Sequence, residues 1–524
     1  MELVVVVKIF VIFYIKISDN KMCGFFITND PSIKKEHENI IEDTLRFRGP
    51  DCSSGLIENN GWQAYHSRLA IIDICSGVNQ PVINKNSMLV FNGEILNYKN
   101  LGFKYFDKEY KSDTLLLNDL LINDKLDLNE LDGFFSFVYI KNGQLVRAVR
   151  DKFGVKPLFY YENNGYFSFS SEPKTLKELY FLNKNPEAIE EYLTTRSPIF
   201  SGSYFDGVKV VEPGHCFVGG LYFDCSDFLN GNYKEITIND IEEALLNGIE
   251  TRKISDAPVG LLLSRGIDSN LLKEMGAFER YYSIGFKGDA DIEYLQSKNI
   301  HNLTLIECEP SDYLSDFNYL LELRGEPMSV PNEVLLYRIS KYAAADGVKV
   351  LLSGEGADEF FAGYDRVFKW AAETKEFDLD TFLELYCYSK PQKESLVYNK
   401  FKTLFESKIF INTFEKVRWF FIRYHMPILF RRLDFSLMAA GIEGREPIAN
   451  MHLFLLAVQM SPESLMGDVL GKMPLRNVIS KYKGDNFAFE KKVGFPVDLT
   501  AIFENKKQLA SYELWFEENL KVLK

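Results

Sequence analysis

The stretch Leu351-Leu352-Ser353-Gly354-Glu355-Gly356-Ala357-Asp358-Glu359 joins an apolar run to a loop of small and acidic residues. The apolar run, residues 348–352, predicts a buried strand, and the small residues after it predict a tight turn before a helix. An earlier segment has the same pattern, because the apolar residues 259–263 lead into a glycine-containing loop and a helix-like segment. Two such strand–loop–helix units predict a parallel sheet with crossover helices.

The loop after the first of these strands reads Leu263-Ser264-Arg265-Gly266-Ile267-Asp268-Ser269. Backbone N–H groups of a small-residue loop, together with a helix N-terminus, form a good environment for phosphate groups. The loop lacks the GxxxxGK[ST] spacing of a Walker A motif. Two acidic side chains and small neighbours in the loop after the other strand suit a magnesium-bound triphosphate. We therefore expect this half of the chain to bind a nucleotide.

The composition excludes several classes of protein. The chain has 524 residues, of which 46% are hydrophobic and 26% charged, as in soluble globular proteins and unlike disordered or multi-span membrane proteins. Its net charge of −14 disfavours binding to nucleic acid. Seven cysteines without regular spacing form no disulfide framework, which favours a reducing compartment. We expect a cytoplasmic protein that binds neither nucleic acid nor membranes.

The N-terminus is unusual for such a protein. Residues 3–17 read LVVVVKIFVIFYIKI, a run of 15 residues that is shorter than the roughly 20 needed to span a bilayer. Met22-Cys23 follows, so translation from Met22 would leave Cys23 as the first residue. A terminal cysteine combines a thiol nucleophile with an α-amine of pKa about 8 that can accept its proton. We expect residues 1–21 to be a misassigned start or a removed leader; a membrane anchor or signal is the alternative.

Four short clusters follow Cys23. They are Arg48-Gly49-Pro50-Asp51, residues 66–73, Asn92-Gly93-Glu94-Ile95 and Ser112-Asp113-Thr114. Together with Cys23 these clusters resemble the class II glutamine amidotransferases, as do residues 131–137 and 150–158. Between them, residues 22–210 alternate short β-type runs with polar turns, which predicts antiparallel sheets. The resemblance implies an N-terminal αββα glutaminase domain of the Ntn type over residues 22–215.

The resemblance also implies a role for each residue of the glutaminase site. Cys23 would attack the glutamine amide and form a thioester, while the Asn92 side chain and the Gly93 backbone N–H would stabilise the oxyanion. Arg68 would bind the glutamine carboxylate, and Glu94 and Asp113 would bind its ammonium group. The remaining expected glutamine-binding residues are Leu69, Ala70, Ile71 and Ile72.

The stretch from Ser353 to Glu359 looks like the SGEGADE motif of the glutamine-hydrolysing asparagine synthetase family, and the loop at Ser264 resembles the SGGxDS loop of ATP pyrophosphatases. The resemblance implies a parallel-sheet α/β domain of the ATP-pyrophosphatase type, with many helices, over residues 241–524, after a linker at 216–240. Its expected ATP-binding residues are Leu263, Ser264, Gly266, Asp268, Ser269, Ile284, Ser353 and Gly354.

The same resemblance assigns the chemistry of this domain. Asp268 and Asp358 would bind Mg²⁺, and Glu355 would help form the acyl-adenylate or take a proton from ammonia. Lys492, in a stretch that resembles the family's KxGF segment, would neutralise the pyrophosphate or the acyl-adenylate. Residues 436–447 resemble the family's SMA…ExRxP segment. Two residues depart from the family pattern: Arg265 stands where the first glycine is usual, and Asn450 replaces an aspartate.

Both halves together imply one reaction, in which glutamine, ATP and aspartate give asparagine, glutamate, AMP and pyrophosphate. An apolar, aromatic interface between the domains would carry the ammonia. Residues 326–333 also resemble relatives that amidate sugar uronates in surface polysaccharides, so a uronate is the alternative acceptor. A non-catalytic relative, impaired by Arg265 and Asn450, is a further alternative. The resemblance also suggests a homodimer.

Overall fold

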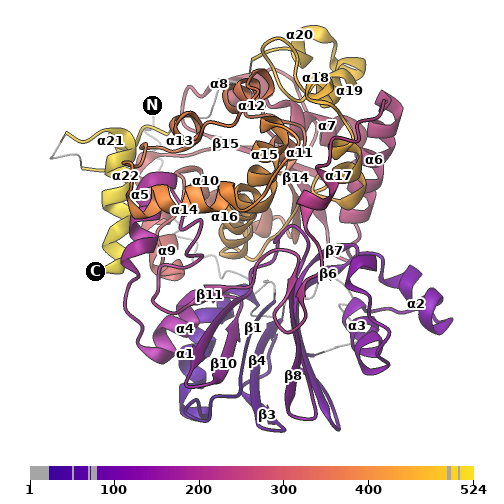
Figure 1. Cartoon of the computed structure of the whole chain (residues 1–524), viewed down its shortest axis with the longest axis vertical. Helices are drawn as coiled ribbons and strands as arrows, with labels where there is room; N and C mark the ends of the chain where they lie inside the picture. The colour runs from indigo at the N-terminus through magenta and orange to yellow at the C-terminus, as the bar shows by residue number, and fades with distance from the viewer. Residues whose placement is uncertain (1–22, 50–51, 69–70, 72–78, 492–496, 505–507) are drawn as a thin grey trace, which may run out of the picture.

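The computed structural model of the chain describes residues 23–49, 52–68, 71, 79–491, 497–504 and 508–524. Figure 1 shows two antiparallel sheets in the N-terminal half and a parallel sheet surrounded by helices in the C-terminal half. This arrangement confirms the expected two-domain fold class. The apolar stretch at residues 3–17 lies outside the described residues, and no helix among the described ranges is long and apolar enough to cross a bilayer.

The first antiparallel sheet has the order β11-β9-β10-β1-β4-β2, with β3 paired to β4. Its strands are β1 (Gly24–Thr28), β2 (Cys52–Ser53), β3 (Ile57–Asn59), β4 (Trp62–Arg68), β9 (Phe159–Asn163), β10 (Tyr166–Ser170) and β11 (Lys209–Val210). The second sheet has the order β13-β12-β8-β7-β6-β5. Its strands are β5 (Val82–Asn84), β6 (Ser87–Ile95), β7 (Gly133–Lys141), β8 (Gln144–Arg150), β12 (His215–Cys216) and β13 (Gly220–Leu221).

The two sheets pack face to face through a shared apolar core, to which strands β1, β4, β6 and β7 all contribute side chains. Phe25 and Ile27 of β1 lie in the core between the sheets, whereas Phe26 faces a separate core under the outer helices. This alternation follows from the two-residue period of a strand. The helices of this half are α1 (Glu38–Leu45), α2 (Tyr98–Phe106), α3 (Asp113–Ile122), α4 (Pro173–Tyr180) and α5 (Pro186–Thr195).

The parallel sheet has the order β16-β15-β14-β17-β18. Its strands are β14 (Val259–Leu262), β15 (Arg280–Gly285), β16 (Leu303–Glu307), β17 (Val350–Leu352) and β18 (Glu443–Arg445). Leu261 and Leu262 enter different cores, so both faces of β14 are covered by helices, as a parallel sheet requires. Its two central strands, β14 and β17, are those expected from the sequence, and each is followed by a loop and a helix.

Helices α6 and α7 lie near β14, and α10 and α16 pack against one face of the sheet. The helices of this half are α6 (Ile238–Arg252), α7 (Ile267–Met275), α8 (Ala290–Gln296), α9 (Pro310–Arg324), α10 (Asn332–Ala345), α11 (Ala357–Phe360), α12 (Asp365–Glu373), α13 (Leu379–Tyr386), α14 (Leu396–Glu406), α15 (Thr413–Phe420), α16 (Met426–Met438), α17 (Met451–Val458), α18 (Pro462–Leu465), α19 (Met473–Lys483), α20 (Asp485–Ala488), α21 (Leu499–Ile502) and α22 (Ser511–Leu520).

The expected domain limit at residue 215 falls inside a hairpin. Strand β12 pairs with β13 and also with β8, where Cys216 lies opposite Val149. The second sheet therefore extends to Leu221, and the connection to α6 spans residues 222–237. The sequence did not indicate these strands because each has only two residues, too few for a visible alternation.

Aromatic side chains join the two halves. Phe153 of the N-terminal half packs edge-on against Phe360 and Phe454 of the C-terminal half, with ring centroids 5.3 and 5.5 Å apart. Phe223 lies 5.8 Å from Phe454 in the same cluster. Buried aromatic pairs contribute about 0.5–1.5 kcal/mol each beyond their buried area, so this cluster helps to hold the halves together.

Candidate active sites

Cys23 precedes β1 directly, at one end of the first sheet. It is half-buried, forms no disulfide, and its carbonyl accepts a hydrogen bond from Nε of Arg48 at 3.3 Å. Gly24 pairs with Ser67 in the β1–β4 ladder. Arg68, the last residue of β4, therefore lies at the same end of the sheet as Cys23. The predicted nucleophile and the predicted carboxylate ligand are thus brought together.

Asn92 and Gly93 lie on β6 in the facing sheet. The Asn92 side chain is buried, and its Nδ2 has no hydrogen-bond partner within the described part of the chain, as expected for a donor that is used only when an oxyanion forms. Gly93 has φ +123°, and a Cβ there would lie 2.0 Å from the Phe134 carbonyl oxygen, so only glycine fits. The His66 imidazole of β4 contacts the Phe91 carbonyl at 3.2 Å and connects the two sheets here.

Glu94 and Asp113 form a buried pair of carboxyl groups. Asp113, the first residue of α3, accepts a hydrogen bond from the Ile95 backbone N–H at 3.0 Å. Burial raises the pKa of Asp113 to about 6. Burial also raises the pKa of Glu94 well above its usual value, and the Asp113 and Glu443 carboxylates add to this shift. A cation between Glu94 and Asp113 would relieve their repulsion, which is consistent with binding of an ammonium group.

Part of the predicted site lies outside the described residues, namely Leu69, Ala70, Ile72 and Lys492. Ile71 is described and is buried. Its carbonyl accepts a hydrogen bond from the Asp256 backbone N–H at 3.0 Å, so this part of the glutaminase domain touches the segment that precedes β14.

The predicted nucleotide-binding residues converge on one cavity of about 450 Å³ at the carboxyl ends of β14, β15 and β17. Its lining includes Leu263, Ser264, Asp268, Ser269, Ile284, Ser353, Gly354, Glu355 and Asp358. Ligands of open α/β sheets bind at this edge, and the volume lies within the roughly 300–1,000 Å³ of small-molecule sites. Of the predicted ATP residues only Gly266 lies elsewhere, in an adjoining cavity of about 350 Å³ that shares Asp268 and Asp358.

The predicted metal ligands already share a cation. Lys472 Nζ lies 2.8 Å from Asp268 and 2.7 Å from Asp358, and Asp268 Oδ1 is buried without a hydrogen bond among the described residues. Burial lowers the pKa of Lys472, but the two carboxylates outweigh it and raise the pKa above its ordinary value. The described ranges contain no group of three or more His, Cys, Asp or Glu side chains suited to a metal. Two carboxylates with phosphate oxygens and water suit Mg²⁺, so the residues fit the ion.

Lys472 was not predicted from the sequence. It has φ +59° and precedes α19, and a Cβ on Gly363 would lie 2.0 Å from Asp358 and 2.2 Å from Cε of Lys472. Glycine at 363 therefore lets these two side chains meet. The only sequence signal was a lysine among apolar residues just before a proline, which is too weak to separate from a surface lysine.

The two departures from the family pattern have structural roles. Arg265 turns away from the loop, pairs with Glu490 and stacks over the Tyr294 ring at 5.3 Å. Asn450 caps α17, because its Oδ1 accepts a hydrogen bond from the Leu453 backbone N–H at 2.9 Å. Neither side chain blocks the cavity that holds the predicted nucleotide-binding residues.

Helix α16 connects the two sites. Asp434 on this helix accepts hydrogen bonds from Arg48 at 2.8 Å and from Lys156 at 3.0 Å, both of the glutaminase half. Two residues earlier, Arg432 donates to Glu355 at 2.6 Å. Burial raises the pKa of Asp434, but Arg48 and Lys156 outweigh it and lower the pKa to about 2. Arg432 was not predicted from the sequence, although it holds the predicted catalytic carboxylate.

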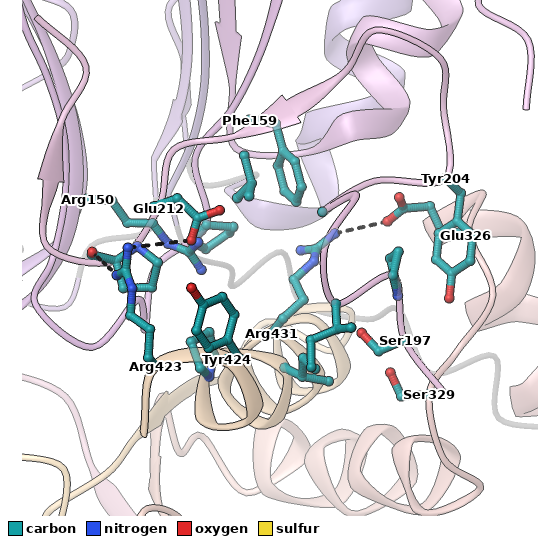
Figure 2. A pocket seen from close by; sticks show the side chains of 18 of the residues that line it. Arg150, Phe159, Ser197, Tyr204, Glu212, Glu326, Ser329, Arg423, Tyr424 and Arg431 are labelled. Atoms are coloured by element: carbon teal, nitrogen blue, oxygen red, sulfur yellow. Dashed lines mark hydrogen bonds and ion pairs between the residues drawn. The ribbon is translucent and has the colours of Figure 1, made fainter. Parts of the chain in front are cut away.

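A third cavity, of about 100 Å³, lies at the junction of the two halves. Figure 2 shows Arg423 reaching Glu212 and Arg431 reaching Glu326 across it, each at 3.7 Å. Its lining mixes charged and apolar side chains and contains neither Cys23 nor Glu355, so it does not join the two candidate sites. Apolar contacts between the halves include the aromatic cluster around Phe153 and the packing of Phe47 against Phe435, with ring centroids 5.4 Å apart.

Comparison with known proteins divides the chain in the same way. Residues 22–222 match the glutamine amidotransferase domain, and residues 240–521 match asparagine synthase. Asparagine synthetase [glutamine-hydrolyzing] 1 of Bacillus subtilis is 29% identical over 392 residues, 68% of this chain and 61% of the relative. The putative asparagine synthetase [glutamine-hydrolyzing] 1 of Methanocaldococcus jannaschii is 28% identical over 497 residues, 86% of this chain and 82% of the relative. The chain thus spans about three-fifths of the Bacillus protein's length.

Among solved structures, the allosteric regulatory enzyme of purine biosynthesis aligns at 12% identity and a TM-score of 0.29, over 55% of this chain and 81% of that one. Fold and sites together define a two-domain protein, with a glutamine amidotransferase domain before a parallel-sheet α/β domain. The match over residues 240–521 covers more than half of the chain, which therefore belongs to the asparagine synthase family.

Proposed function

We propose that the protein is a glutamine-hydrolysing, ATP-dependent amide synthetase that converts aspartate to asparagine and releases glutamate, AMP and pyrophosphate. The observation that carries this proposal is the convergence of the predicted nucleotide-binding residues on one cavity, with the Glu355 carboxylate on its wall. The glutaminase residues gather at a separate site, and the family relatives bear names consistent with both halves.

The glutaminase half of the proposal begins at Cys23. With a free α-amine, Cys23 would transfer its thiol proton to that amine and attack the glutamine amide. The buried Asn92 amide would donate to the oxyanion, while Glu94 and Asp113 would hold the substrate ammonium. The proposal requires that the N-terminus of the working protein is Cys23, which the intact mass of the natively expressed protein would test.

The synthetase half needs a carboxylate activated by ATP. The small-residue loop at Ser264 and the helix N-terminus after it would bind phosphates, and Asp268 and Asp358 would hold Mg²⁺, which neutralises triphosphate charge when bound. Lys472 would then move from the two carboxylates towards the phosphates. Glu355, held by Arg432, would accept a proton from ammonia as it attacks the acyl-adenylate.

The acceptor has an alternative supported by one observation. Asn332, Leu335 and Leu336 form one wall of the cavity, and Asn332 belongs to the stretch that resembles the uronate-amidating relatives. A sugar uronate is therefore the second candidate acceptor.

The test uses protein that starts at Cys23, with glutamine, ATP and Mg²⁺, and compares aspartate with a nucleotide-linked uronate. Glutamate, pyrophosphate and asparagine in equal amounts support aspartate as the acceptor. Pyrophosphate formed only with the uronate supports the second candidate. Absence of ATP–pyrophosphate exchange with either acceptor would refute the synthetase proposal and favour a non-catalytic relative.

A further inference from the structure

Arg445 crosses the boundary between the two halves of the molecule. It lies on β18, the edge strand of the parallel sheet, and its guanidinium is fully buried. Nε donates to Glu443, and Nη1 donates to the carbonyls of Arg252 at 2.9 Å and Ile254 at 2.6 Å. These three contacts fix the guanidinium and leave Nη2 pointing away from them.

Nη2 of Arg445 faces the glutaminase site. It lies 3.8 Å from Glu94 Oε1 and has no hydrogen-bond partner in the described part of the chain. Glu94 Oε2 is likewise buried without one. Buried polar atoms are normally hydrogen-bonded, so two unsatisfied atoms facing across one boundary indicate an arrangement that changes when a ligand binds. Glutamine's ammonium, placed between Glu94 and Asp113, would be that ligand.

The backbone of Arg445 reaches the nucleotide site. In the parallel ladder Leu352 pairs with Arg445, and the Ser353 backbone N–H donates to the Arg445 carbonyl at 2.9 Å. Ser353 Oγ in turn accepts a hydrogen bond from the Glu355 backbone N–H at 3.2 Å. Both Ser353 and Glu355 line the nucleotide cavity. One residue therefore contacts a predicted glutamine ligand through its side chain and a predicted nucleotide ligand through its backbone.

We propose that Arg445 couples the two sites as a positioning residue. The glutamine ammonium attracts the Glu94 carboxylate away from Arg445. The Arg445 guanidinium then shifts relative to the carbonyl groups that it contacts, and the hydrogen bond from the Ser353 backbone N–H to the Arg445 carbonyl on β18 changes. Nucleotide binding at Ser353 is transmitted through the same contacts from Arg445 to Glu94. Each ligand therefore increases the affinity of the protein for the other. The inference rests on the proposed function and adds to it a specific route of communication.

The test measures glutamine binding in full-length Cys23→Ser protein, which cannot hydrolyse it, with and without ATP and Mg²⁺. We expect ATP to tighten glutamine binding at least about fivefold, the lower end of measured coupling between sites. Arg445→Met should reduce this factor to below about twofold. Linkage requires the same factor for the effect of glutamine on ATP affinity, so the reverse titration checks the measured factor. A purely structural role for Arg445 would leave this factor unchanged in Arg445→Met.

Arg252→Met is the matched control. Arg252 is buried and also crosses the boundary, pairing with Asp132 at 3.1 Å, but its side chain contacts neither Glu94 nor Ser353. Its coupling factor should equal that of the parent protein. Arg445→Lys keeps the charge but cannot reach Glu443, both carbonyls and Glu94 together, so it should also lose coupling. This variant provides the test if Arg445→Met does not fold.

Two results would overturn the inference: no effect of ATP on glutamine affinity in the parent protein, or an unchanged factor in both Arg445 variants. Neither depends on catalysis. If the wild-type protein forms glutamate and pyrophosphate but the coupling factor is unchanged in both Arg445 variants, the inference fails and the proposed function stands. If the parent protein binds neither glutamine nor ATP, the proposed function fails as well.

Discussion

Replacing Lys472 by methionine removes the cation shared by Asp268 and Asp358. In the wild-type protein the Lys472 ammonium contacts both carboxylates, and its side chain is only 5% exposed. The two carboxylates would repel each other after the substitution, and Asp268 would lose its ion pair with the Lys472 ammonium. We therefore expect the Lys472→Met protein to be less stable than the wild type and to be stabilised when Mg²⁺ binds.

The expected loss in free energy of unfolding follows from the burial of the ion pairs that Lys472 makes. Removing one partner of a buried ion pair costs about 3–5 kcal/mol. The Asp358 side chain is 32% exposed, so water screens part of its charge. We therefore expect Lys472→Met to lower the free energy of unfolding by about 3 kcal/mol. A ligand present at about 100 times its Kd stabilises by about 2.7 kcal/mol. Millimolar Mg²⁺ should therefore restore most of the loss in Lys472→Met and stabilise the wild type much less, because Lys472 occupies the site.

The assay is equilibrium urea unfolding of the full chain with and without Mg²⁺, without nucleotide. Lys369→Met is the control: Lys369 is 44% exposed and donates to the Asp468 carbonyl, so its loss should change the free energy of unfolding by less than about 0.5 kcal/mol. Equal stability of Lys472→Met and wild type, or equal stabilisation of both by Mg²⁺, would refute the assignment of Asp268 and Asp358 as the metal site.

Three further predictions follow from the ionisable groups. Asp434→Asn should lower the free energy of unfolding in urea by about 3 kcal/mol. The deficit should be complete above about pH 5 and shrink as pH falls towards 2, because the Asp434 carboxyl of the unfolded wild type binds a proton at its ordinary pKa whereas the folded carboxylate, with its pKa lowered to about 2, stays ionised. An undiminished deficit at pH 2 would contradict this. The affinity of Cys23→Ser protein for glutamine should weaken about tenfold per pH unit below pH 6, where Asp113 with its raised pKa becomes neutral. A glutamine affinity that does not change with pH in calorimetry would exclude Asp113 as a ligand. Glu355→Gln should lower amide formation at least about 100-fold and leave glutamate release intact; equal loss of amide and glutamate in a coupled assay would argue for a structural role.

Much of the fold was predictable because local patterns determined it. The apolar runs after which Ser264 and Ser353 occur became the central strands β14 and β17 of the parallel sheet. The face-to-face sheets followed from the alternation in strands such as β1. The short hairpin after His215 was not predictable, because two-residue strands are formed by pairing with β8 rather than by their own sequence.

The sites were predictable where their residues occur in compact motifs. The loops at Ser264 and Ser353 meet in one cavity because both follow neighbouring parallel strands. Lys472 could not be found in this way, because it lies 204 residues from Asp268 and meets it only through tertiary folding. Arg445 belongs to a segment that resembles the family's SMA…ExRxP pattern, but its position beside Glu94 depends on how the two halves pack.

The proposed function requires that one chain transfers nitrogen from glutamine to an ATP-activated carboxylate. The most direct measurement supplies protein that starts at Cys23 with amide-¹⁵N glutamine, ATP, Mg²⁺ and aspartate or a uronate, in the presence of unlabelled ammonium, and analyses the product by mass spectrometry. The account predicts a ¹⁵N-labelled amide formed with equimolar glutamate and pyrophosphate, and no label in Cys23→Ser protein. Pyrophosphate with an unlabelled amide would contradict transfer between the sites, and absence of any amide with either acceptor would contradict the synthetase assignment.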